Sequence, residues 1–162
     1  MTEHSSIQEM WNAFTSQHPQ FSQSTYIAWA FGDGTKEMAD DLCKLVLEGK
    51  KQGTSSYYDA YEKENEPLPV KGQWNIILDG NGVAQAIMQT IKVDILPYNE
   101  MTEKHAYAEG EGDQTLAYWK EVHEPFFSQL APTLGLTFQE NDLVVYEWLK
   151  LVYKNEAKEV SV

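Results

Sequence analysis

A run of amines and hydroxyls, Gly49-Lys50-Lys51-Gln52-Gly53-Thr54-Ser55-Ser56, carries the clearest chemical potential of this chain. A hydroxyl can act as a nucleophile, and a nearby amine can carry its proton. A simpler interpretation also fits these residues: a helix ends at Gly49, where a positive φ costs little, and its lysines face water. Short polar motifs arise easily by chance, so a functional interpretation requires partners from other parts of the chain.

The spacing of Lys51 and Thr54 sets a condition on the local structure. Three residues apart, their side chains meet on a turn but face opposite ways on a straight strand. Lys51 accepts a proton only in its neutral form, which burial or the neighbouring Lys50 would favour. Backbone N–H groups near Gly53 could then hold an oxyanion. Acyl transfer by this pair therefore requires residues 49–56 to form a turn.

Amphipathic helices are predicted before this stretch. Residues 7–14 have helical periodicity, with Ser5 or Ser6 as the cap and Pro19 as the end. Residues 35–48 form the clearest helix, capped by Thr35. Its apolar stripe consists of Met38, Ala39, Leu42, Leu45 and Val46. Cys43 flanks the stripe, and we interpret it as a small core residue.

Strands dominate the middle and the end of the chain. Residues 73–78 and 83–95 flank the turn 79–82, which predicts an antiparallel hairpin. Residues 143–153 predict a final strand, whereas residues 26–31 fit either a strand or a short helix.

Two further helices are predicted between these strands. Thr102 caps residues 103–109, and Asp113 caps a helix that Pro125 should end or kink. This order of elements indicates an α+β fold, with a mostly antiparallel sheet, flanking helices and room for a small β-barrel.

The composition restricts the classes of partner. The chain has 162 residues, 42% hydrophobic and 23% charged, which suits one globular domain. Its net charge of −13 disfavours a surface that binds a nucleic-acid backbone and favours a small neutral ligand. We find no membrane-spanning run and no signal pattern, and a single cysteine excludes an intrachain disulfide. A cytoplasmic location is the default expectation.

Histidines and aromatic residues add weaker signals. His105, His123, Glu109 and Asp113 lack the tight spacing of a metal site, so we predict neither a metal nor another cofactor. Several aromatic side chains could stack on a base, although at these spacings they favour the core. These residues are Trp29, Tyr57, Trp74 and Trp119.

Residues 45–55 resemble the Gly-x-Lys-x-x-Thr stretch of ASCH domains, which belong to the PUA-like superfamily. Residues 102–109 match a second stretch of that family. The loop 109–113, Tyr118-Trp119 and His123 are similar to a bacterial subgroup of about this length. The resemblance covers residues 26–153 and implies a small PUA-like β-barrel with a cleft on one side.

The resemblance also implies an activity. Some similar bacterial members are amidohydrolases that deacetylate acetylated cytidine, and their lysine, threonine and glutamate correspond to Lys51, Thr54 and Glu109. Where those hydrolases tend to carry an arginine after the threonine, this chain has Ser55, Ser56 and Tyr57. Glu109 would orient Lys51 or pass a proton to the leaving amine. Without the resemblance, Glu109 is better explained as an exposed carboxylate at a helix end.

We therefore predict Lys51, Thr54 and Glu109 as catalytic residues of a nucleoside-directed hydrolase. Lys50, Gly53, Ser55 and Tyr57 are predicted to contact a small nucleoside or nucleotide. The alternatives are a noncatalytic RNA- or nucleotide-binding module and a ribonuclease. The predicted organisation is an N-terminal helical extension over residues 1–24, an ASCH domain over 25–154 and a polar tail over 155–162.

Overall fold

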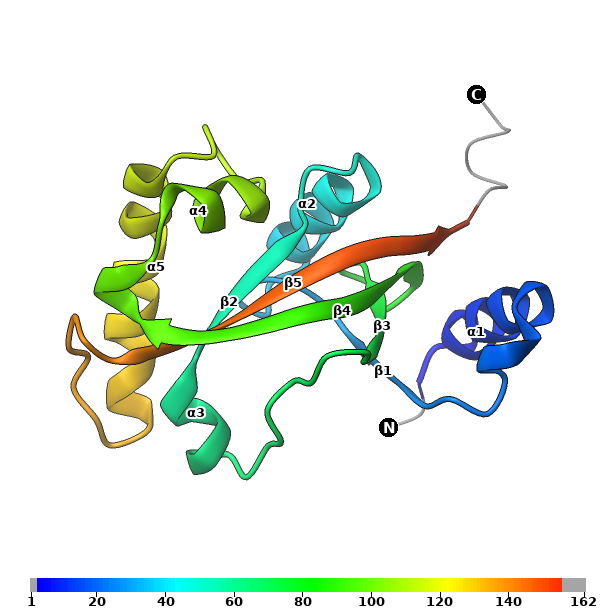
Figure 1. Cartoon of the computed structure of the whole chain (residues 1–162), viewed down its shortest axis with the longest axis horizontal. Coiled ribbons are helices and arrows are strands. Elements are labelled where there is room, and N and C mark those ends of the chain that lie inside the picture. Colours follow the sequence, from blue (N-terminus) through cyan, green and yellow to red (C-terminus); the bar gives the residue numbers. More distant parts are fainter. Residues whose placement is uncertain (1–2, 156–162) are drawn as a thin grey trace. The chain divides into compact units, whose positions relative to one another are not determined.

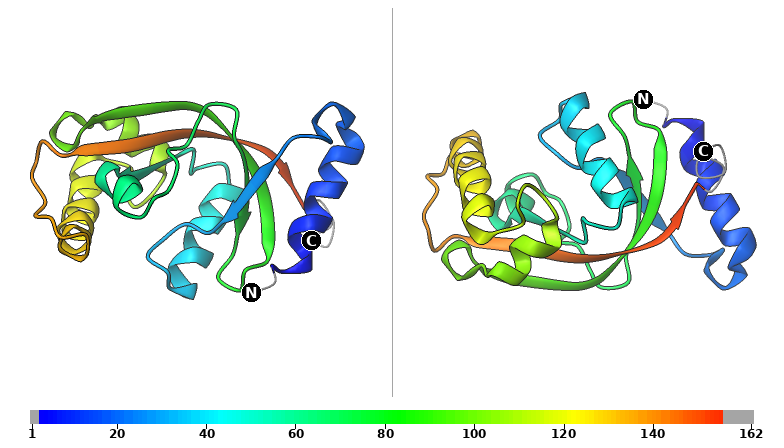
Figure 2. Two further views of the ribbon diagram at one scale, coloured as in Figure 1. Left: turned by 90° about the horizontal axis from the view of Figure 1, so that it is seen from below. Right: turned by 90° about the horizontal axis from the view of Figure 1, so that it is seen from above.

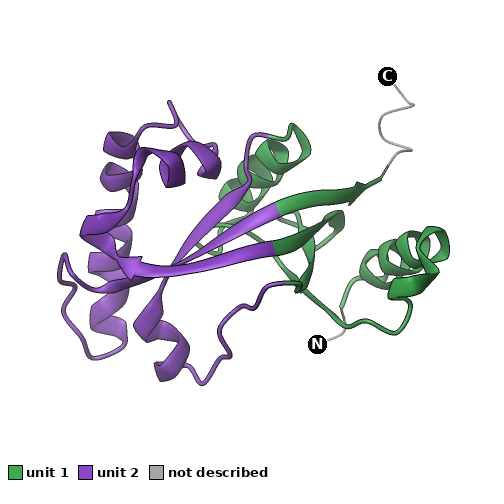
Figure 3. Ribbon diagram, viewed as in Figure 1, with its two compact units in different colours: residues 1–49, 72–90, 150–162 green, residues 50–71, 91–149 purple. Residues whose placement is uncertain are grey.

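The computed structural model describes residues 3–155 and divides into two compact units (Figures 1 and 3). Unit 1 comprises residues 1–49, 72–90 and 150–162, and unit 2 comprises residues 50–71 and 91–149. The elements are α1 Ser5–Gln17, η1 Pro19–Phe21, β1 Tyr26–Trp29, α2 Lys36–Leu47, β2 Gly53–Tyr57, α3 Tyr58–Lys63, β3 Trp74–Leu78, β4 Ala84–Pro97, η2 Tyr98–Glu100, α4 Glu103–Glu109, α5 Leu116–Thr133 and β5 Leu143–Lys154.

The helices of unit 1 confirm the predictions from periodicity. In α2, the Thr35 side chain accepts from the backbone N–H of Met38, and Cys43 is buried. In α1, the cap is the His4 side chain rather than a serine, because its Nδ1 accepts from the N–H of Ser6. The core of unit 1 is aromatic-rich and contains Ile7, Met10, Trp11, Phe14, Trp74, Ile76, Ala84 and Ile87.

The predicted hairpin is confirmed. β3 and β4 pair antiparallel, and Asp79 closes the turn by accepting from the N–H groups of Asn81 and Val83. Gly82 takes a φ of 78°, which an L side chain rarely adopts. β1 pairs parallel with β3, which resolves residues 26–29 as a strand and makes the sheet mixed.

Unit 2 holds a second core and the other helices. α4 and α5 pack against each other, as Figure 2 shows. The core of this unit contains Tyr57, Tyr98, Met101, Ala106, Trp119, Phe127, Ala131, Val144 and Tyr146. β2 pairs antiparallel with β5 in the same unit.

The strands form one five-stranded sheet in the order β1-β3-β4-β5-β2, and residues of β4 and β5 belong to both units. This order leaves β1 and β2 as edges among the described residues. The predicted closed barrel is therefore not confirmed. The mixed sheet with flanking helices agrees with the predicted α+β class.

Two local predictions are wrong, and a third, that Pro125 ends or kinks its helix, is wrong about the end. The expected turn at residues 49–56 contains β2, because Gly53–Tyr57 pairs with β5. The cap of α5 is Thr115 rather than Asp113, whose carboxylate instead accepts from the Thr115 N–H and hydroxyl. Pro125 lies inside α5 on an exposed position, where the carbonyl deprived of its helical partner can bond to water. Most of the predicted polar tail, residues 156–162, lies outside the described residues.

Candidate functional site

Gly110 brings two distant segments of unit 2 together. α4 ends at this residue with a φ of 73°, and a Cβ here would lie 2.4 Å from the carbonyl oxygen of Lys50. Only glycine permits both this conformation and this approach. The N–H of Gln52 donates to the carbonyl of Ala108 at 2.6 Å across the same junction. The contact places Lys51 beside the end of α4.

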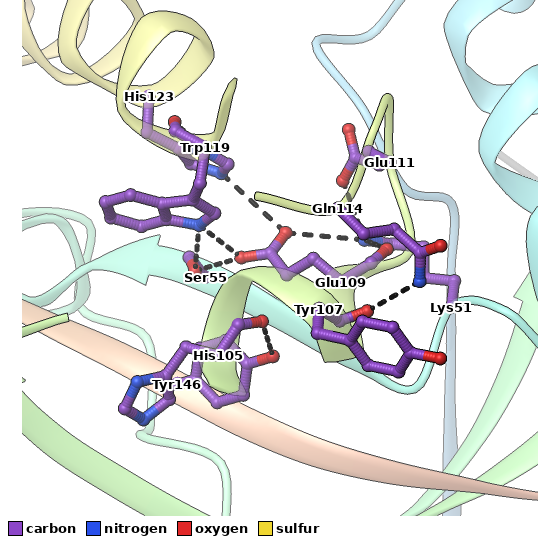
Figure 4. Close-up of polar contacts among 10 residues, drawn as sticks. All are labelled: Lys51, Ser55, His105, Tyr107, Glu109, Glu111, Gln114, Trp119, His123 and Tyr146. Carbon is purple, nitrogen blue, oxygen red and sulfur yellow. Dashed lines mark hydrogen bonds and ion pairs between the residues drawn. The ribbon is translucent and has the colours of Figure 1, made fainter. Parts of the chain in front are cut away.

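Lys51 is a buried ammonium held by carboxylates. Its side chain is 1% exposed, and its Nζ lies 2.9 Å from Glu111 Oε2 and 3.4 Å from Glu109 Oε1 (Figure 4). It also donates to the Glu109 carbonyl at 3.3 Å. An ammonium between two carboxylates donates hydrogen bonds and has no lone pair to accept a proton. Lys51 therefore donates hydrogen bonds to both carboxylates, and its role as a base stays a prediction.

Glu109 is the centre of the arrangement. The residue is 3% exposed, and its Oε2 accepts from Trp119 Nε1 at 2.7 Å and from the Ser55 hydroxyl. His123 Nε2 lies 3.7 Å from its Oε1. Burial alone would raise the pKa of Glu109, but Lys51, His123 and the hydrogen bonds from Ser55 and Trp119 outweigh it and lower the pKa. The carboxylate is therefore held ionised.

The hydroxyl beside Glu109 belongs to Ser55 and not to Thr54. Successive side chains of a strand point to opposite faces. In β2, Ser55 reaches Glu109, whereas the Ser56 hydroxyl bonds to Tyr61 at 2.7 Å on the other face. Thr54 shares that other face, with Glu147 as its cross-strand partner. The structure thus joins Lys51 and Glu109 and leaves Thr54 apart from them.

The four residues predicted to bind substrate do not lie together in the structure. Lys50 is exposed, and Gly53 packs against Tyr146, where an added Cβ would lie 2.0 Å from the Tyr146 hydroxyl oxygen. Tyr57 belongs to the core of unit 2 and donates to Asp142 at 2.6 Å. Gly53 and Tyr57 therefore support the strand, and Ser55 is the member of the predicted set that contacts Glu109.

A small cleft opens beside the carboxylate. Its lining residues are Ala106, Glu109, Glu111, Thr115, Tyr118, Trp119 and His123. The space of about 10 Å³ suits a single water molecule.

His123 is oriented over this cleft. It stacks on Trp119 with ring centroids 4.3 Å apart, and its Nδ1 lies 2.8 Å from the Trp119 carbonyl oxygen. Because a carbonyl oxygen only accepts, we assign a proton to Nδ1. The other ring nitrogen, Nε2, faces Glu109.

Sequence reasoning did not place Glu111, Trp119 and His123 in one site. The four-residue spacing of Trp119 and His123 on α5 indicates a shared helix face. The approach of that face to Glu109 depends on the tertiary contact of α4 with α5. Among residues 3–155, no group of three or more His, Cys, Asp or Glu side chains is arranged to hold a metal ion. In the same residues, no helix has the length and apolar character needed to cross a membrane.

Comparisons with known proteins agree with this architecture. A protein from Enterococcus faecalis V583, assigned to the family DUF984, superposes with a TM-score of 0.84 at 37% identity, covering 96% of this chain and 93% of its own. An ASCH domain from Lactobacillus crispatus JV V101 superposes with a TM-score of 0.87 at 28% identity, covering 94% and 98%. No curated protein matches this chain. The model of the ASCH domain matches residues 27–153, so the chain belongs to the ASCH domain family.

Proposed function

We propose that this protein is an amidohydrolase that removes the acyl group from an acylated nucleoside, with acetylated cytidine as the substrate class. The observation that carries the proposal is the Ser55 hydroxyl donating to a buried, ionised Glu109 that Lys51 holds in place. A hydroxyl, a carboxylate and a fixed cation are the groups that acyl transfer needs.

The geometry supports the following steps. Ser55 Oγ attacks the acyl carbon, and its proton passes to Glu109 Oε2. The tetrahedral intermediate expels the exocyclic amine, which takes the proton from Glu109. A water molecule then cleaves the Ser55 ester, with Glu109 relaying its proton back to Ser55 Oγ, and acetate leaves. Trp119 Nε1 lies 3.3 Å from Ser55 Oγ, so its N–H is placed to stabilise the developing charge.

Lys51 and His123 act through Glu109. Lys51 is 1% exposed, so it positions the carboxylate and does not contact a substrate. His123 lines the water-sized cleft, and its Nε2 lies 3.7 Å from Glu109 Oε1. The cleft suits the hydrolytic water of the second step.

The charge of the protein supports a neutral substrate. Its net charge is −13, and Glu111 adds a carboxylate to the cleft. A long polyanion would meet repulsion there. The same repulsion disfavours the ribonuclease alternative, whereas the noncatalytic binding module is an outcome of the acetate assay.

The test is acetate release from acetylated cytidine by the purified protein. We expect Ser55→Ala to lower turnover on the order of 10³-fold or more. Ser56→Ala is the matched control, because its hydroxyl lies in the same strand and bonds to Tyr61. Thr54→Ala should also retain activity.

Each other outcome is informative. Loss of turnover in Thr54→Ala but not in Ser55→Ala would move the nucleophile to the other face of β2. A wild-type protein that releases no acetate would refute the hydrolase, and retained nucleoside binding by that protein would favour the noncatalytic module.

A further inference from the structure

A histidine closes the N-terminus of α4. The Thr102 hydroxyl accepts from the backbone N–H of His105, and His105 Nδ1 accepts in return from the Thr102 N–H at 3.1 Å. This arrangement is a capping box, in which the third helical residue is ordinarily a glutamate or a glutamine. Those side chains keep an acceptor near neutral pH, whereas an imidazole keeps one only while it is uncharged. The cap of α4 therefore depends on the protonation of His105.

The contacts of His105 define the state of its ring. A backbone N–H only donates, so Nδ1 carries the lone pair and we assign the ring proton to Nε2. Nε2 lies 3.7 Å from Asp94 Oδ2, which accepts from Trp148 Nε1 at 2.7 Å. A second proton can bind only at Nδ1, because that nitrogen carries the lone pair. Nδ1 would then become a donor that faces the Thr102 N–H, and the bond between them would be lost.

His105 is buried among charges of both signs. The titratable groups near its ring come from β4, α4 and β5, and they are Asp94 with its partner Lys92, Lys104, Glu109 and Tyr146. Burial lowers the pKa of His105 and Lys104 adds to this effect, while the carboxylates of Asp94 and Glu109 oppose it without cancelling it. The folded protein thus favours the neutral ring. The stability that this ring contributes is lost as pH falls from 6.5, the ordinary histidine value, through the lower value of the folded state.

The short helix α4 presents Glu109 at its end. Its seven residues form about two turns, too few for a helix that lacks outside contacts. The Tyr146 hydroxyl donates to the His105 carbonyl at 2.7 Å (Figure 4), and the Gln52 N–H donates to the Ala108 carbonyl at 2.6 Å. The first of these bonds holds the turn that the cap closes. Loss of the cap would loosen that turn and its bond to Tyr146, and with them the helix that carries Glu109.

We propose that His105 is a positioning residue for Glu109: its neutral ring completes the cap of α4, and protonation of the ring releases the first turn of this helix. Other residues line the cleft beside Glu109, so His105 acts through the backbone of α4. Its effect on turnover rests on the proposed hydrolase, whereas the protonation-dependent cap does not.

The test is hydrogen exchange of the His105 and Ala106 amides at pH 5 and pH 7.5. Both amides donate to Thr102, the first to its hydroxyl and the second to its carbonyl. Exchange is expressed as protection factors, which remove the intrinsic pH dependence, and amides of the β2–β5 pair serve as the reference for global unfolding. Loss of a cap typically shifts the equilibrium of a helix about 5-fold. We therefore expect the protection of the two amides, relative to the reference, to be roughly 5-fold lower at pH 5.

The decisive variant is His105→Gln. A glutamine amide offers an acceptor at both pH values, so protection should be the same at pH 5 and pH 7.5. His105→Ala lacks the acceptor and should show the lowered protection at both. His4 provides the matched control, because its Nδ1 caps α1 by accepting from the Ser6 N–H at 3.1 Å. His4→Asn should leave the pH dependence of the α4 amides intact.

Turnover provides a second readout. The ratio of acetate release at pH 5 to that at pH 7.5 should be higher in His105→Gln than in the wild type, and an equal ratio would refute the positioning role. The cap itself is refuted by equal wild-type protection at both pH values, by wild-type pH dependence in His105→Gln, or by a nitrogen spectrum at pH 7.5 that places the ring proton on Nδ1. A protein with pH-dependent protection of α4 that releases no acetate would support the cap and refute the hydrolase.

Discussion

The ion pair of Lys51 and Glu109 is fully buried, so its two members depend on each other. Removing one charge leaves the other without compensation, which typically costs about 3–5 kcal/mol. We therefore expect Lys51→Met to lower the free energy of unfolding by that amount, measured in urea. Glu109→Gln removes the more crowded charge but leaves Lys51 with Glu111 at 2.9 Å, so it should cost less.

The double variant Lys51→Met, Glu109→Gln is the matched control. It removes both charges, so it should be more stable than Lys51→Met alone. Additive losses in the double variant would show that the two groups are not coupled, and the electrostatic account of the site would then fail.

The pKa of Glu147, which burial raises, makes the protein less stable as pH rises, whereas an acidic residue in an ion pair makes it more stable. Its pKa in the folded protein is raised to about 7 from 4.5, so the folded state binds more protons than the unfolded state between these values. Stability therefore falls as pH rises from about 4.5 to 7, by up to about 3 kcal/mol, and is constant above that range.

The pH dependence of stability should differ between the wild type and Glu147→Gln. Glu147→Gln should match the wild type near pH 4.5 and exceed its stability at pH 8, as measured by urea unfolding. Glu109 provides the contrast, because its lowered pKa adds stability that is lost as pH falls through the folded value. Equal pH dependence in wild type and Glu147→Gln would contradict the assignment of the shift to Glu147.

At the scale of elements, Gly53 allows β2 to pack closely against Tyr146 of β5. A Cβ at this position would lie 2.0 Å from the Tyr146 hydroxyl oxygen, which donates to the carbonyl of His105 at 2.7 Å. We expect Gly53→Ala to displace Tyr146 and to destabilise the protein by about 1–3 kcal/mol. Thermal unfolding of Gly53→Ala and of the double variant with Tyr146→Phe measures this effect. The double variant should recover part of the loss, because the closest atom is gone.

The same strand explains what sequence could predict of the site. The segments holding Lys51 and Glu109 were identified by resemblance, and the structure brings the two residues together. A turn at residues 49–56 would have placed Thr54 beside Lys51 and Glu109. The pairing of β2 with β5 instead puts Ser55 on the face that meets Glu109. Side chains of neighbouring strand residues point to opposite faces, so this pairing decides which hydroxyl of β2 contacts Glu109. Local sequence does not encode it, because β5 lies far along the chain.

Elements with strong local signals were predicted well. The hairpin of β3 and β4 and the Thr35 cap of α2 depend on neighbouring residues and were found as expected. The passage of α5 through Pro125 and the parallel pairing of β1 with β3 depend on the surrounding fold. Tertiary packing overrode local preference in the first of these and decided an ambiguous pattern in the second.

For the whole molecule, charge determines which ligands can approach. The chain has 25 acidic residues against 12 basic ones. ASCH domains are associated with RNA and nucleotide binding, so the charge of this chain matters for its choice of ligand. Binding to a long RNA gains free energy mainly from counterions released by lysine and arginine, and here such residues are scarce. One lysine, Lys51, is already committed to two carboxylates and is 1% exposed.

We therefore expect weak, nonspecific binding of long RNA at physiological salt. Titration of a labelled single strand at two salt concentrations measures both the affinity and its salt dependence. Few phosphate contacts predict a shallow dependence, since the slope scales with the number of phosphates neutralised. A neutral nucleoside escapes this repulsion, so its affinity should change little between the same two salt concentrations. Submicromolar RNA binding with a steep salt dependence would mean that the basic residues are gathered on one surface, and the preference for a small neutral ligand would then be wrong.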